Sequence, residues 1–126
     1  MKISEHDLHK SFAESIRTWQ RLNKLHCLFW SYDASGEYRK KTTASLLKAK
    51  GLNAGHPDYQ FITECPNGLS YSYIIYIEFK VKPNKQSKSQ VHFQSQCKKT
   101  GNLKYYVCYS VEEAEAILKE WEIIKD

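Results

Sequence analysis

Apolar residues recur along this chain with two different periods, and each change of period indicates a new element. From Leu8 to Leu22 they lie three or four residues apart, which places them on one face of a helix. Ser4 and Asp7 precede that stripe at the spacing of a capping box. The pattern predicts an amphipathic first helix that runs to about Leu25.

The most apolar stretch, Tyr73 to Lys82, predicts a β-strand at the centre of the fold. Aromatic and β-branched residues fill almost every position, and the turn signal Pro66-Asn67-Gly68 precedes them. Because side chains alternate along a strand, Ile77 points to one face while Glu78 and Lys80 point to the other. An acid and a lysine are costly to place there unless they are paired, solvated or bound to a ligand.

The other segments predict alternating strands and helices in a single domain over residues 1–126. The element order is α-β-α-β-β-α-β-α, which predicts an α/β fold with a mixed sheet and helices on both faces. The remaining strands are expected over 27–32, 58–64 and 103–110, and the remaining helices over 38–50, 88–100 and 111–124.

Charge is distributed unevenly along the chain. The net charge of +5, from 19 basic and 14 acidic residues, is only a weak pointer to nucleic acid. However, carboxylates are absent between Glu37 and Asp58 and again between Glu78 and Glu112, and both stretches are rich in lysine. These lysines are either phosphate contacts or ordinary solvated side chains.

Cysteine usage and hydropathy narrow the class of protein. The four cysteines are widely spaced, with no Cys-x-x-Cys pair and no histidine at zinc-finger spacing, so reduced thiols are expected. Apolar runs are too short to cross a membrane, and the N-terminal residues are too polar for a signal peptide. We therefore expect an intracellular protein with no membrane partner.

Asp58 and Glu78 are the candidate site residues. The hairpin would place them on neighbouring antiparallel strands, where two carboxylates repel each other unless a cation lies between them. Oxygen ligands without cysteine or histidine favour Mg²⁺ or Mn²⁺ over zinc. Lys80 would point to the same place and could orient a water or stabilise charge on a phosphate. Together these groups predict hydrolysis of a phosphodiester.

These residues form a pattern that resembles a known family. Gly55-His56-Pro57-Asp58 followed by Ile77-Glu78-Phe79-Lys80 resembles the PD-(D/E)xK nuclease signature, and specifically its VRR-NUC branch, the virus-type replication-repair nucleases. Ser87-Lys88-Ser89-Gln90 and Ser110-Val111-Glu112-Glu113-Ala114 resemble later segments of that branch, in the correct order. The resemblance covers nearly the whole chain and implies a restriction-endonuclease-like fold.

The resemblance also implies roles for individual residues. Asp58 and Glu78 would be metal ligands together with the Phe79 backbone carbonyl, and Lys80 would be the catalytic lysine. Gln90 would be an active-site helper, with a purely structural role as the third residue of a capping box as the alternative.

The first helix of the family carries a glutamate that belongs to the site. Glu5 matches the spacing of that glutamate and lies near the apolar stripe of the helix, so it can face the core. Glu14 is the fallback and is expected to face water. The chain departs from the family at His9, where glutamine is frequent, and at Ser35-Gly36 ahead of Arg39, where Asn-Gly is frequent.

The expected activity is that of a metal-dependent DNA endonuclease. Family analogy implies a homodimer that acts on branched DNA such as Holliday junctions. A non-cleaving DNA-binding domain of a repair or replication assembly, and a nuclease of unbranched duplex, remain alternatives. The expected phosphate contacts are Arg39, Lys40, Lys41, Lys82, Lys85 and Lys88.

Overall fold

The computed structural model describes residues 3–33, 46, 48–50, 54–65 and 71–126. Within them lie a four-stranded sheet and three named helices, so the protein has an α/β fold. The elements are α1 (Glu5–Arg21), β1 (Cys27–Tyr32), β2 (Tyr59–Thr63), β3 (Ile74–Phe79), α3 (Lys88–Cys97), β4 (Leu103–Cys108) and α4 (Val111–Glu120).

The sheet is mixed, and β3 is one of its two inner strands. The strand order is β1-β2-β3-β4, with β1, β2 and β3 antiparallel in turn and β4 parallel to β3. A parallel pair needs a crossover connection, which α3 provides between β3 and β4. The prediction of a β2–β3 hairpin with a central third strand is confirmed, although its expected turn, Pro66-Asn67-Gly68, lies outside the described residues.

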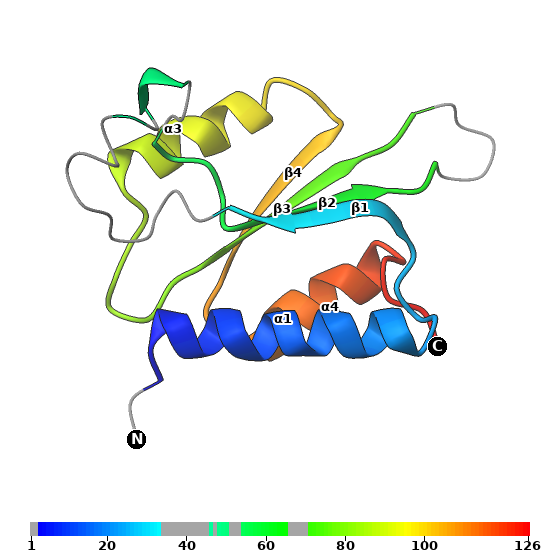
Figure 1. Cartoon of the computed structure of the whole chain (residues 1–126). Helices are drawn as coiled ribbons and strands as arrows, with labels where there is room; N and C mark the ends of the chain where they lie inside the picture. The colour runs from blue at the N-terminus through cyan, green and yellow to red at the C-terminus, as the bar shows by residue number, and fades with distance from the viewer. Residues whose placement is uncertain (1–2, 34–45, 47, 51–53, 66–70) are drawn as a thin grey trace.

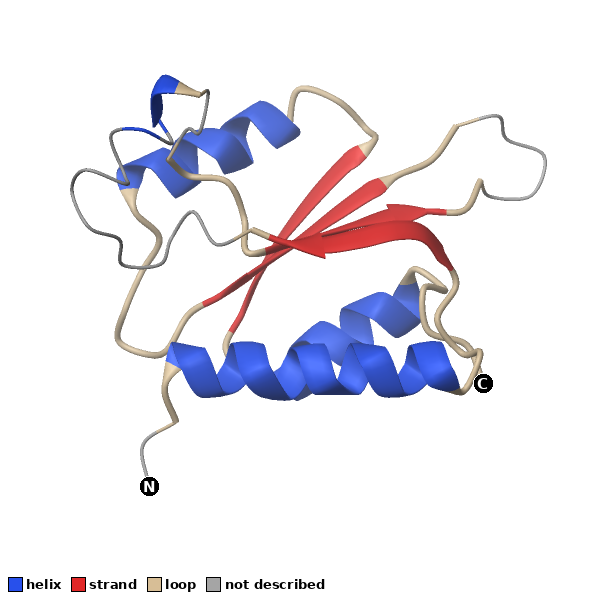
Figure 2. Cartoon of the chain, in the orientation of Figure 1, coloured by secondary structure: helices blue, strands red, loops and turns tan. Residues whose placement is uncertain are grey.

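Helices lie on both faces of the sheet. Helices α1 and α4 pack side by side on one face and α3 lies on the other (Figure 1), as the colouring by secondary structure also shows (Figure 2). The apolar stripe of α1, which includes Leu8, Phe12 and Ile16, is buried against Phe61 and Phe79 of the sheet. The main core therefore lies between the sheet and the α1–α4 pair.

Predicted helix starts agree with the structure better than predicted helix ends do. Capping boxes begin α1 at Ser4 and α3 at Ser87. However, α1 stops at Arg21 and α4 at Glu120, before the expected ends near 25 and 124. In both cases a residue with positive φ follows and turns the chain, Asn23 after α1 and Glu122 after α4.

The remaining boundaries differ by a few residues. Helix α3 ends at Cys97 and β4 at Cys108, earlier than the expected 100 and 110. Most of the helix expected over 38–50 lies outside the described residues.

The four cysteines are free thiols, two of them buried. In the described part of the chain, no helix is long and apolar enough to cross a membrane.

Candidate active site

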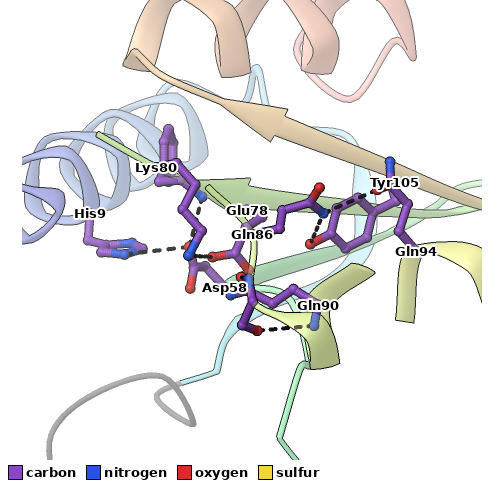
Figure 3. Close-up of polar contacts among 10 residues, drawn as sticks. His9, Asp58, Glu78, Lys80, Gln86, Gln90, Gln94 and Tyr105 are labelled. Carbon is purple, nitrogen blue, oxygen red and sulfur yellow. Dashed lines mark hydrogen bonds and ion pairs between the residues drawn. The ribbon is translucent and has the colours of Figure 1, made fainter. Parts of the chain in front are cut away.

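The β2–β3 hairpin brings Asp58 and Glu78 together. Tyr59 pairs with Ile77 in the antiparallel register, so the residue before Tyr59 and the residue after Ile77 stand opposite each other. The Phe79 amide donates a hydrogen bond to Asp58 Oδ2 at 2.8 Å. The backbone of β3 therefore fixes the Asp58 carboxylate beside Glu78 (Figure 3).

Glu78 is the one charged residue that is buried among the residues that the structure describes. Its exposed fraction is 1%, and its Oε1 atom has no hydrogen-bond partner among the described residues. Burial raises the pKa of Glu78 to about 9, and the neighbouring Asp58, through its charge and a hydrogen bond, adds to the rise. Without a cation, Glu78 is therefore a neutral acid at pH 7.

Lys80 partly opposes this rise. Its Nζ lies 3.8 Å from Glu78 Oε2, and its side chain is only 13% exposed. The ammonium charge lowers the pKa of Glu78 by less than burial and Asp58 raise it. Two acids and one ammonium thus converge at the end of β3, as the sequence predicted (Figure 3).

His9 is a site residue whose position the sequence pattern did not reveal. Its Nε2 lies 3.6 Å from Asp58 Oδ2, and its Nδ1 is buried with no partner among the residues described. The Tyr59 hydroxyl donates to the His9 carbonyl at 3.2 Å, and the His9 and Phe79 rings lie edge to face with centroids 5.5 Å apart. The sequence feature that could have indicated this role is the position of His9, one turn after Glu5 and next to the buried Leu8.

Glu5 and Glu14 of α1 differ as the sequence predicted. Glu5 is half-buried, and its charge contributes to the raised pKa of Glu78, so it lies within electrostatic range of the site. Glu14 is exposed and lines a separate shallow hollow on α1 with Thr18 and Trp19. Of the two, Glu5 is the acid near the site.

Gln90 has a structural role at the start of α3. Its Oε1 accepts a hydrogen bond from the Ser87 amide at 2.8 Å, and its own amide donates to Ser87 Oγ at 3.2 Å (Figure 3). This is the capping-box geometry that the sequence left open as an alternative. The carboxamide oxygen of Gln90 therefore caps the start of α3.

A network of three polar side chains beside the site was also not predicted from the sequence. The Gln86 amide donates to Gln94 Oε1 at 3.1 Å and to the Tyr105 hydroxyl at 3.2 Å. Burial raises the pKa of Tyr105, and the charges of Glu78 and Asp58 raise it further. The network joins the loop after β3 to α3 and β4 on the α3 side of the sheet (Figure 3).

The segment before Asp58 needs a glycine for geometric reasons. Gly55 has φ of +96°, and a Cβ atom built there would lie 2.5 Å from the Ser89 carbonyl oxygen of α3. The next residue, His56, packs edge to face against Tyr76 and Phe93, and its Nδ1 lies 3.0 Å from Asp33 Oδ2. Close packing of this segment against α3 therefore positions Asp58.

The expected phosphate contacts are only partly within the described structure. Lys82, Lys85 and Lys88 are exposed in the segment from the end of β3 to the first turn of α3. The Lys82 ammonium also lies over the Tyr109 ring, 5.4 Å from its centroid. Arg39, Lys40 and Lys41 lie outside the described residues.

The donor set suits a hard divalent cation. Across the described ranges, no three or more His, Cys, Asp or Glu side chains are already gathered as metal ligands. The unpartnered Glu78 Oε1, buried beside Asp58, nevertheless leaves an oxygen whose desolvation a cation would offset. Asp58 and Glu78 therefore fit as two ligands of Mg²⁺ or Mn²⁺, with Glu5 near enough to contribute charge.

Comparisons with known proteins add no assignment. No family model, no curated protein and no solved structure matches this chain.

Proposed function

We propose that this protein is a divalent-metal-dependent DNA endonuclease of the VRR-NUC branch, with a restriction-endonuclease-like fold. The observation that supports this most is the buried carboxyl of Glu78, which has an unpartnered oxygen and lies beside Asp58 and Lys80 at one end of the hairpin. A carboxyl held in this way destabilises the fold, so a function that uses it gives the best reason for it to be there.

Different residues of the site would have different roles in the reaction. Asp58 and Glu78 would hold the cation, with the Phe79 carbonyl and Glu5 as further oxygen donors. When bound, the cation supplies charge neutralisation at the phosphate and lowers the pKa of a water. Lys80 Nζ, 3.8 Å from Glu78 Oε2, orients that water or stabilises the charge that develops on the phosphate oxygens.

Lys82, Lys85 and Lys88 would contact the DNA backbone. They are exposed in the segment that follows the strand of Glu78, and contacts of this kind give affinity and salt sensitivity without reading base sequence. Recognition of branched DNA by shape, and action as a homodimer that cuts one strand per subunit, rest on the family resemblance.

Cleavage of labelled DNA tests the proposal directly. Four-way junction and linear duplex are incubated with Mg²⁺ or Mn²⁺, with Lys80→Ala and Asp58→Asn as variants and Lys119→Ala, an exposed lysine of α4, as control. We expect cleavage by the wild type and the control, no cleavage by either site variant, and retained DNA binding by Lys80→Ala. Failure to cut either substrate would leave a non-cleaving DNA-binding domain, and equal cutting of both would exclude junction preference.

A further inference from the structure

The residue that follows β1 contacts the segment that leads to Asp58. Strand β1 pairs antiparallel with β2 at the edge of the sheet (Figure 1), and its last residue, Tyr32, lies opposite Tyr59, the first residue of β2. One step beyond both strands, Asp33 therefore meets Asp58. The Asp33 amide donates a hydrogen bond to the Asp58 carbonyl at 2.7 Å. Asp33 is thus bound to the backbone of a candidate metal ligand.

The carboxylate of Asp33 contacts the other end of the same short segment. Its Oδ2 lies 3.0 Å from His56 Nδ1, and the same nitrogen lies 2.9 Å from the Pro57 carbonyl oxygen. Because a carboxylate and a carbonyl can only accept, His56 Nδ1 carries the hydrogen that it shares between them. The Asp33 and His56 side chains are 28% and 30% exposed, so water competes only partly for this contact.

The segment between these two contacts has little freedom. Pro57 lies between His56 and Asp58, is fully buried, and has its φ fixed by its ring. The His56 ring packs edge to face against two aromatic rings, with centroids 5.7 Å and 5.5 Å away. A single residue, Asp33, therefore holds both ends of a stiff tripeptide that carries the Asp58 carboxylate.

We propose that Asp33 is a positioning residue that holds the Asp58 carboxylate in the orientation in which it binds the divalent cation. This rests on the proposed function and adds to the site a residue from the end of β1. Asp33 does not itself bind the cation. Its carboxylate accepts the hydrogen bond from His56, and its effect reaches Asp58 through the backbone. Loss of a group that orients a metal ligand commonly costs about 10- to 100-fold in metal affinity.

Two other roles for Asp33 would give different signatures. A contact that only stabilises the fold would lower the thermal stability of a variant and leave the metal affinity of the folded protein unchanged. A carboxylate that binds the cation directly would need its negative charge. The proposed role needs an oxygen acceptor at this position, whether or not that acceptor is charged.

Mn²⁺ binding to the metal-free chain, measured by calorimetry, tests the proposal at a temperature at which circular dichroism shows every variant folded. Asp33→Ala removes the acceptor of His56 and should weaken Mn²⁺ binding about tenfold. Asp33→Asn keeps an oxygen acceptor and should bind Mn²⁺ like the wild type. Asp126→Ala, which removes an exposed aspartate, is the matched control and should also bind like the wild type.

A double-mutant cycle tests whether the effect passes through His56. His56→Phe keeps an aromatic ring for packing but removes the Nδ1 donor. If Asp33 acts through this nitrogen, Asp33→Ala should weaken Mn²⁺ binding little further in the His56→Phe background, so the two losses are not additive. In cleavage assays, Asp33→Ala should need about tenfold more Mn²⁺ for half of its maximal rate.

Three results would overturn the positioning role. These are an unchanged Mn²⁺ affinity in Asp33→Ala, an equal loss of affinity in Asp33→Asn and Asp33→Ala, and additive losses in the cycle. Cleavage decides the proposed function separately. If the wild type cuts DNA while Asp33→Ala keeps its Mn²⁺ affinity, only the positioning role fails. If the affinities change as expected but the wild type does not cut, only the nuclease fails. Absence of Mn²⁺ binding by the wild type would overturn both.

Discussion

His9 Nε2 lies 3.6 Å from Asp58 Oδ2, so the first helix meets the residue that precedes the second strand at the candidate active site. The same Oδ2 atom accepts a hydrogen bond from the Phe79 amide at 2.8 Å. One oxygen of Asp58 is thus oriented by two groups from different elements. His9 acts on the site through Asp58, which makes it a positioning residue.

Replacement of His9 should therefore reduce activity without abolishing it. We expect His9→Ala to lower the cleavage rate about tenfold and to weaken metal binding, as loss of a group that orients a ligand commonly does. His92→Ala on α3 is the matched control, because the His92 ring is exposed and its described hydrogen bond is to Gln96 of the same helix. Metal affinity measured by calorimetry separates this role from a structural one, and equal affinity in both variants would contradict it.

Stability without metal should fall as the pH rises, because of Glu78. The pKa of this carboxyl is 4.5 in the reference state and about 9 in the folded protein, so between these values the folded chain keeps a proton that the unfolded chain has lost. The free energy of unfolding then decreases by up to about 1.4 kcal/mol per pH unit from this group. The contribution is intact below pH 4.5 and is lost progressively toward pH 9.

Urea unfolding of Glu78→Gln across this pH range tests whether the free energy of unfolding decreases with pH because of Glu78. The neutral amide should flatten the dependence and make the metal-free protein more stable than the wild type near pH 8. Glu14→Gln, which alters an exposed acid on α1, should retain the wild-type slope. A wild-type slope in Glu78→Gln would show that another group causes the dependence.

Gly55→Ala should destabilise the fold and disturb the site together. The positive φ alone costs about 1 to 3 kcal/mol for a residue with a Cβ atom, and the contact at 2.5 Å with the Ser89 carbonyl adds to it. Gly101→Ala is the control, because no described atom lies within 4 Å of a Cβ built there. Thermal unfolding of the two variants checks this, and equal midpoints would contradict the argument.

Glu5 and Glu14 of α1 should differ in their effect on metal binding. Glu5→Gln removes a negative charge that acts on Glu78, so we expect weaker Mn²⁺ binding and slower cleavage. Glu14→Gln should change neither, because the side chain is exposed on another side of the helix. Calorimetric titration with Mn²⁺ measures the difference; equal affinities would remove Glu5 from the ligand set.

The sequence predicted the parts of the site that depend on local patterns. Strand alternation placed Glu78 and Lys80 on one face, and the hairpin placed Asp58 opposite Glu78, because both follow from strand geometry and register. The helix starts were also predictable, since the capping residues are adjacent in sequence.

The parts that depend on distant packing were not predictable from one sequence. His9 reaches Asp58 only because α1 packs across β2 and β3, and periodicity does not specify that docking. The Gln86–Tyr105 contact likewise depends on how the crossover returns to β4. Helix ends were overestimated where Asn23 and Glu122 adopt positive φ; asparagine is enriched in this conformation, whereas glutamate gives no such signal.

The mixed order of the sheet has a consequence for folding kinetics. Pairing of β3 with β4 requires closure of the whole α3 crossover, whereas β2 and β3 are joined by the shorter connection. Contacts between residues near in sequence form at lower entropic cost, so the hairpin is the favoured early nucleus. The repelling acids that it carries would then meet before the rest of the sheet has assembled, and protonation of Glu78 at low pH should speed refolding.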